Sequence, residues 1–101
     1  KEYDLPILSF GHAGDGNLHV YILRGERSRE EWLVLMEQAM ERIYAKAKEL
    51  TGQVSGEHGI GFAKREYLAE SLGPEQLDLL KAIKASFDPK HILNPGKVVL
   101  A

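Results

Sequence analysis

The sequence contains no cysteine, which excludes disulfide bonds, thiolate metal ligands and cysteine nucleophiles. This absence fits a reducing compartment, so we expect a cytoplasmic protein. The net charge is only -2, so electrostatics give no indication of nucleic-acid binding. No apolar run approaches the roughly 20 residues of a membrane-spanning helix. What is present is the composition of one ordinary globular domain, with 44% hydrophobic residues in a chain of 101.

Hydrophobic periodicity predicts an α+β fold, in which a small antiparallel sheet carries one long helix and two or more shorter helices. The long helix has a capping box at its start, formed by Ser28 and Glu31. A later helix has Pro74 at its first position. The expected elements are strands at 5–10 and 18–23, helices at 28–50, 62–71 and 74–88, a short strand at 53–55 and an extended tail at 98–100.

Two glycine-flanked clusters contain three of the four histidines and six of the ten glycines. The first cluster is GHAGDGNLH at 11–19, and the second is SGEHGIG at 55–61. Imidazole and carboxylate groups in loops that permit close backbone approach are what a metal site or a proton-transfer site needs. The chemistry of the chain is therefore expected in these two clusters.

The spacing of His12 and His19 is informative, because the two residues are seven positions apart. On one straight strand their side chains would point to opposite faces, about 23 Å apart. A helix is disfavoured by the glycines between them. A turn at 13–16 would instead place the two rings diagonally across a hairpin, with β-carbons about 7–8 Å apart. The sequence therefore predicts a turn that lets both imidazoles reach one ion.

Two imidazoles leave a catalytic metal site one protein ligand short. Glu57 in the second cluster is the natural third ligand. A set of two histidines and one glutamate suits zinc, manganese, iron or cobalt, and the ligand types do not choose among these metals. His58 is then left for a separate role as general base, and a cation beside it would help a bound hydroxyl to lose its proton.

The residues alone leave a plainer interpretation open, in which both clusters are ordinary solvent-exposed loops. Asp15 and Asn17 are expected to form the turn rather than to bind a metal. His91 has no accompanying cluster and is expected on the surface. The segment 59–64 has part of a dinucleotide-binding fingerprint but lacks its third glycine and its strand–helix surroundings, so we exclude that function.

A third motif, FDPKHILNPGK at 87–97, follows the two clusters. In this order and spacing, the three motifs resemble the C-terminal end of the FAD-linked oxidases, the group of glycolate oxidase large subunit, D-lactate dehydrogenase and D-2-hydroxyglutarate dehydrogenase. These proteins share the vanillyl-alcohol-oxidase-type flavin fold. The resemblance covers essentially the whole chain. It implies that residues 1–101 are the C-terminal part of a larger substrate (cap) domain with its tail, and that the FAD-binding domain is absent.

The resemblance also implies an activity, namely FAD-dependent oxidation of a D-2-hydroxy acid of the glycolate or D-lactate type to the 2-oxo acid. A divalent metal held by His12, His19 and Glu57 would bind the carboxylate and hydroxyl of the substrate. His58 would take the hydroxyl proton, and a hydride would pass from C2 to the flavin. Asn94 would lie close to the flavin ring, so Asn94 and Glu57 are the expected cofactor-binding residues.

The implied partners are a small 2-hydroxy acid and an electron acceptor, which could be an electron-transfer flavoprotein, an iron–sulfur subunit, a quinone or oxygen. Partner subunits could hold the protein at the periphery of a membrane, and exposed apolar surface could support a homo-oligomer. The chain begins without Met, and we expect a fragment that neither binds FAD tightly nor turns over substrate by itself. The alternatives are a stand-alone metal- or ligand-binding or assembly module without catalysis, and a degenerate relative that binds no metal.

Overall fold

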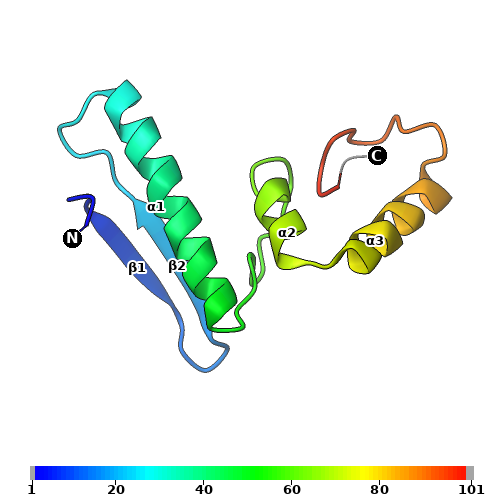
Figure 1. The fold of residues 1–101 in the computed structure, drawn as a ribbon, viewed down its shortest axis with the longest axis horizontal. Coiled ribbons are helices and arrows are strands. Elements are labelled where there is room, and N and C mark those ends of the chain that lie inside the picture. Colours follow the sequence, from blue (N-terminus) through cyan, green and yellow to red (C-terminus); the bar gives the residue numbers. More distant parts are fainter. Residues whose placement is uncertain (1, 100–101) are drawn as a thin grey trace. The chain divides into compact units, whose positions relative to one another are not determined.

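The computed structural model describes residues 2–99 (Figure 1). These residues contain a two-stranded antiparallel sheet and three helices, which confirms the predicted α+β class. The chain divides into two compact units, Lys1–Thr51 and Gly52–Ala101. The elements in chain order are β1 (Ile7–His12), β2 (Asn17–Ile22), α1 (Arg29–Glu49), α2 (Arg65–Ser71) and α3 (Pro74–Phe87).

The first unit opens with the hairpin of β1 and β2, in which Ile7 pairs with Ile22 and His12 pairs with Asn17. The four residues between the strands form the predicted turn at 13–16. Its backbone is closed by the N–H of Asp15, which donates to the carbonyl oxygen of His12 at 3.1 Å. The strands differ from the predicted 5–10 and 18–23 by one or two residues at their ends, because the ladder continues up to this turn.

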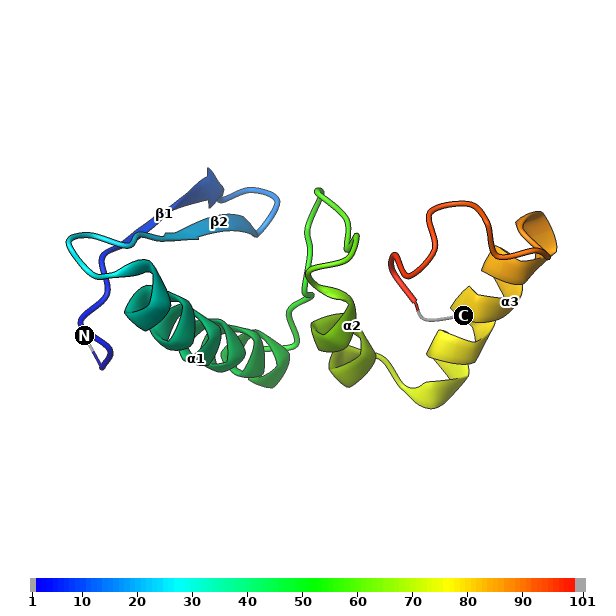
Figure 2. The same ribbon diagram turned by 90° about the horizontal axis from the view of Figure 1, so that it is seen from above.

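Helix α1 follows the hairpin, and its start is the predicted capping box. The hydroxyl oxygen of Ser28 accepts from the N–H of Glu31 at 3.2 Å, while the N–H of Ser28 donates to the carboxylate of Glu31 at 3.4 Å. The helix ends as predicted before Thr51, whose φ of 60° is incompatible with further helix. Within this unit α1 runs alongside the hairpin (Figure 2).

The second unit contains α2 and α3. Gly73 is the N-cap of α3, and Pro74 takes its first position as predicted. Helix α2 begins at Arg65, three residues later than the predicted 62–71 helix, because residues 61–64 form turns. The predicted strand at 53–55 is wrong: the structure shows loop and bend there, where the carbonyl oxygen of Val54 accepts from the Lys64 side chain at 3.4 Å and no strand of residues 2–99 pairs with the segment.

The predicted extended tail at 98–100 is also wrong for Val98, whose φ is 64°. Its N–H donates to the carbonyl oxygen of Gly61 at 2.6 Å, and this bond bends the tail back onto the loop before α2. Leu100 lies outside the described residues.

Little of the apolar surface is buried. Among residues 2–99 the apolar side chains classed as buried are Leu5 and Ala39, while Phe10 is 57% exposed and Leu18 is 64% exposed. Apolar exposure on this scale is typical of surfaces that contact other protein. No helix in this part of the chain is both long and apolar enough to cross a membrane.

Candidate active site

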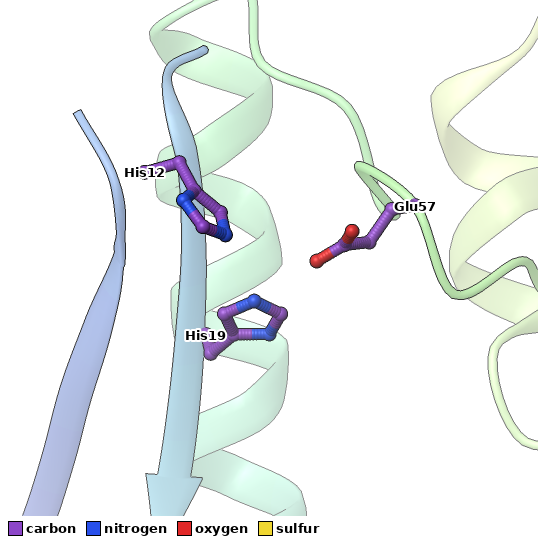
Figure 3. A group of neighbouring side chains, drawn as sticks. All are labelled: His12, His19 and Glu57. Carbon is purple, nitrogen blue, oxygen red and sulfur yellow. The ribbon is translucent and has the colours of Figure 1, made fainter. Parts of the chain in front are cut away.

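The hairpin brings two of the predicted metal ligands together. His12 pairs with Asn17, and His19 pairs with Phe10, so the two histidines are diagonal neighbours on one face of the ladder. A ring nitrogen of His12 and one of His19 lie within 4.8 Å of each other (Figure 3). Two ligand nitrogens of a tetrahedral zinc ion are about 3.4 Å apart for bonds of about 2.1 Å. A small rotation of these side chains is therefore enough for both to bind one cation.

A close backbone approach supports this pair at the turn end of the hairpin. A β-carbon at Gly11 would lie 2.0 Å from the carbonyl oxygen of Asn17. Only glycine therefore allows the two strands to approach in this way next to His12. This is the close approach that the glycine-rich pattern of the first cluster predicts.

An aromatic row supports the second histidine. The ring of Phe10 lies 5.4 Å from that of His19 and 5.5 Å from that of Tyr21, measured between centroids. Phe10 and Tyr21 are nearly parallel, with 10° between their planes. His12 is exposed and His19 is half-buried, so the pair combines one solvent-exposed ring with one that packs against the ring of Phe10.

The other two predicted residues, Glu57 and His58, lie in the loop before α2 in the second unit. The hydroxyl of Ser55 accepts from the N–H of Gly59 at 3.0 Å, which closes this loop. Gly59 has a φ of 80°, a conformation that favours glycine. The Nε2 atom of His58 lies 3.7 Å from a carboxylate oxygen of Glu57, and both side chains are exposed. Figure 3 draws the Glu57 carboxylate at the tip of its loop.

Contacts within the second unit join the second and third motifs, and no local pattern in the sequence predicts them. The guanidinium of Arg65 donates to the carbonyl oxygen of Gly96 at 2.9 Å. It also lies over the ring of Phe62, 4.1 Å from its centroid. Together with the Val98–Gly61 bond, these contacts fasten the tail to the loop that carries Glu57.

Asn94 lies in this tail, is exposed and has a φ of 44°. Its carbonyl oxygen accepts from the N–H of Lys97 at 3.4 Å. His91 is exposed, as predicted.

The segment before Asn94 is organised by Asp88, whose side chain is 3% exposed. The carboxylate accepts a hydrogen bond from the ammonium group of Lys84. It also accepts from the N–H group of Ile92 and from that of Leu93, and both of these backbone bonds are 3.0 Å long. The hydrogen bond from Lys84, opposed by burial and helped by the two backbone bonds, lowers the pKa of Asp88 to about 2. Asp88 is not among the predicted site residues, although a lysine four residues earlier is a signal for an ion pair.

Comparison with known proteins bears on all three motifs. Residues 1–98 match the family model described as FAD linked oxidases, C-terminal domain. A D-lactate dehydrogenase of Anaerostipes hadrus is 50% identical over 97 residues, which are 96% of this chain and 20% of the relative. Glycolate oxidase subunit GlcD of Bacillus subtilis (strain 168) has the same identity and the same coverage of both chains.

A third relative is a D-2-hydroxyglutarate dehydrogenase of Stutzerimonas stutzeri (strain A1501). It is 39% identical over 99 residues, which are 97% of this chain and 21% of the relative. The chain thus spans about a fifth of the length of these curated relatives. The resemblance inferred from the three motifs is confirmed, and the chain belongs to the family of FAD-linked oxidases, whose C-terminal domain it matches over residues 1–98.

Proposed function

We propose that this chain supplies the metal ligands and the general base of an FAD-dependent D-2-hydroxy-acid dehydrogenase or oxidase. The observation that carries the proposal is the diagonal pair of His12 and His19, with ring nitrogens within 4.8 Å of each other. Two imidazoles at this separation on neighbouring strands can both reach one cation after a small rotation of their side chains. The family supports the flavin, since its members are FAD-linked.

Glu57 is the proposed third ligand. Two imidazoles and a carboxylate form a nitrogen and oxygen donor set that fits zinc, manganese, iron or cobalt. Three protein ligands also leave a coordination position open for substrate. A divalent cation bound there would lower the pKa of a substrate hydroxyl placed next to it.

His58 is the proposed general base. It follows Glu57 directly, and its Nε2 atom lies 3.7 Å from the Glu57 carboxylate, so a ligand and a base would reach the substrate from one short loop. The side chain is exposed and can turn toward a bound hydroxyl. His58 would accept the hydroxyl proton while C2 loses a hydride, which leaves the 2-oxo acid.

FAD would supply the hydride acceptor and would be held mainly by protein outside this chain. Asn94 is the proposed contact of this chain with the flavin ring. The electron acceptor of the whole protein would be an electron-transfer flavoprotein, an iron–sulfur subunit, a quinone or oxygen. The substrate would be glycolate, D-lactate or a related acid, because the relatives are named for 2-hydroxy acids.

The test uses the full-length protein that carries this chain, assayed with glycolate, D-lactate and D-2-hydroxyglutarate, with and without a chelator. Turnover of at least one acid, lost on chelation and restored by a divalent metal, is the expected result. His58→Asn should lower kcat by about 10²–10⁴-fold, the usual contribution of a general base. His91→Asn is the matched control, because asparagine tolerates the left-handed backbone of His91.

Turnover that is insensitive to the chelator would contradict the metal role. Metal binding without turnover of any 2-hydroxy acid by the flavin-loaded protein would favour the non-catalytic binding module.

A further inference from the structure

The buried carboxylate of Asp88 does more than end helix α3. The backbone N–H of Asp88 already donates to the carbonyl oxygen of Lys84 at 2.9 Å, and this bond alone closes the last turn. The side chain of Asp88 instead reaches four and five residues onward, to the N–H groups of Ile92 and Leu93. Two of its side-chain hydrogen bonds therefore hold the loop after the helix, and the one from Lys84 ties that loop to the last turn of α3.

Lys84 holds the same loop at a second point. Its ammonium group donates to Asp88 and, at 2.6 Å, to the carbonyl oxygen of Leu93. The two peptide groups that flank Leu93 are thus both anchored to the last turn of α3. The second of these peptide groups is the one that joins Leu93 to Asn94, so its orientation is fixed where the chain enters Asn94.

The chain is held again just after Asn94, where the carbonyl oxygen of Gly96 accepts from Arg65. Asn94 therefore lies between two anchored points. Its φ of 44° lies in the left-handed region, which asparagine adopts more readily than most residues, and the two anchored points hold the chain on either side of it. The carboxylate of Asp88, which is 3% exposed, thus holds the segment that leads into the exposed Asn94.

We propose that Asp88 and Lys84 are positioning residues for Asn94, and that they fix the backbone from which its side chain reaches the flavin. This inference rests on the proposed function, in which Asn94 contacts the flavin ring. The geometry requires two links: Asp88 orients the N–H groups of the loop, and Lys84 orients the peptide bond before Asn94.

The test is a double-mutant cycle in the full-length flavoprotein, read by kcat and by the visible absorption and circular dichroism of the bound flavin. Asn94→Gly removes the amide but keeps the left-handed backbone unstrained. We expect it to lower kcat about tenfold and to shift the flavin spectrum. Asp88→Asn should change both readouts in the same direction by a smaller factor. In the Asn94→Gly background, Asp88→Asn should have almost no further effect on either readout.

The control is Asp78→Asn, an exposed carboxylate on the same helix, which should leave kcat and the spectrum unchanged. A further loss of kcat by Asp88→Asn in the Asn94→Gly background, equal to its loss alone, would overturn the inference. An ineffective Asp88→Asn beside an effective Asn94→Gly would overturn it as well. If Asp88→Asn does not fold, Lys84→Met carries the same cycle with the same criteria.

Failure of the proposed flavin role of Asn94 can be distinguished from failure of the positioning role of Asp88 and Lys84. If Asn94→Gly changes neither readout, both the flavin role of Asn94 and this inference are wrong. Metal-dependent turnover, and the roles of His12 and His58, would be unaffected by that result.

Discussion

The two units present their functional residues in different ways. In the first unit, His12 and His19 stand on a regular antiparallel ladder, and the register alone makes them neighbours. In the second unit, Glu57, His58 and Asn94 lie on irregular segments, which side-chain hydrogen bonds to the backbone hold in place. The histidine pair of the first unit thus depends on strand pairing, whereas the residues of the second unit depend on a few polar contacts.

The largest effect is expected from a break in the ladder. Gly11→Ala places a β-carbon 2.0 Å from a backbone oxygen, so the strands must separate next to His12. We expect a destabilisation of about 2–3 kcal/mol, as for overpacking elsewhere, and weaker metal binding. Gly14→Ala is the control, because nothing lies within 4 Å of its added β-carbon. Chemical unfolding and metal titration of both variants measure their stability and metal affinity. Equal values for Gly11→Ala and Gly14→Ala would contradict the close approach of the two strands at Gly11.

In the second unit the corresponding break is protonation of Asp88. Its pKa is about 2 in the folded protein against an ordinary value of 3.8, so its contribution to stability is complete above pH 3.8 and is lost as the pH falls toward 2. Hydrogen exchange of the Ile92 and Leu93 amides, corrected for the intrinsic effect of pH, should show constant protection above about pH 4 and falling protection below it.

Asp88→Asn should remove most of this protection already at pH 5. Protection of the two amides that survives both acid and the substitution would show that the carboxylate does not hold the loop.

A smaller effect is expected at the helix starts and ends. Ser28→Ala removes the capping box of α1 and should cost about 1 kcal/mol of stability. Ser86→Ala in α3 loses only a bond from the hydroxyl to the carbonyl oxygen of Ile83 inside its own helix, and should cost close to nothing. Thermal unfolding measures the loss of stability in each variant. A larger loss for Ser86→Ala than for Ser28→Ala would contradict the stabilising role of the capping box.

The smallest effect should come from an exposed ion pair of the first unit. Lys46 and Glu49 lie 2.8 Å apart on α1, with about two-thirds of each side chain in solvent. Lys46→Met should change stability by no more than about 0.5 kcal/mol. Lys84→Met should cost clearly more, because it removes two hydrogen bonds and leaves a buried carboxylate without its cation. Equal losses of stability for Lys46→Met and Lys84→Met in chemical unfolding would mean that the burial of Asp88 does not strengthen its ion pair with Lys84.

The same contrast explains how far the sequence predicts the structure. A turn of glycine and aspartate between two predicted strands indicates the hairpin, and seven-residue spacing then places His12 and His19 diagonally. The capping box and the proline at position 74 predict where two helices begin. These are local patterns, and each needs only neighbours along the chain or across one turn.

The predictions failed where distant partners decide the conformation. The predicted strand at 53–55 has no strand to pair with among residues 2–99, and the side chain of Lys64 donates to the carbonyl oxygen of Val54 in this segment. The sequence predicts an extended conformation for Val98, but the hydrogen bond from its N–H to the carbonyl oxygen of Gly61 bends the chain there. The hydrogen bond between Arg65 and Gly96 joins residues that are 31 positions apart, and no periodicity in the sequence predicts it.

We propose that His12, His19 and Glu57 bind one metal ion, and the visible absorption of bound Co²⁺ is the sharpest test of this site. In the full-length protein, His12→Asn and Glu57→Gln should each abolish the same absorption band and weaken Co²⁺ binding more than about a hundredfold, above the usual cost of losing an outer-shell partner. The double variant should add no further loss, and Glu37→Gln should behave as wild type. An unchanged band in Glu57→Gln would contradict the claim, because the histidine pair would then bind the metal without that carboxylate.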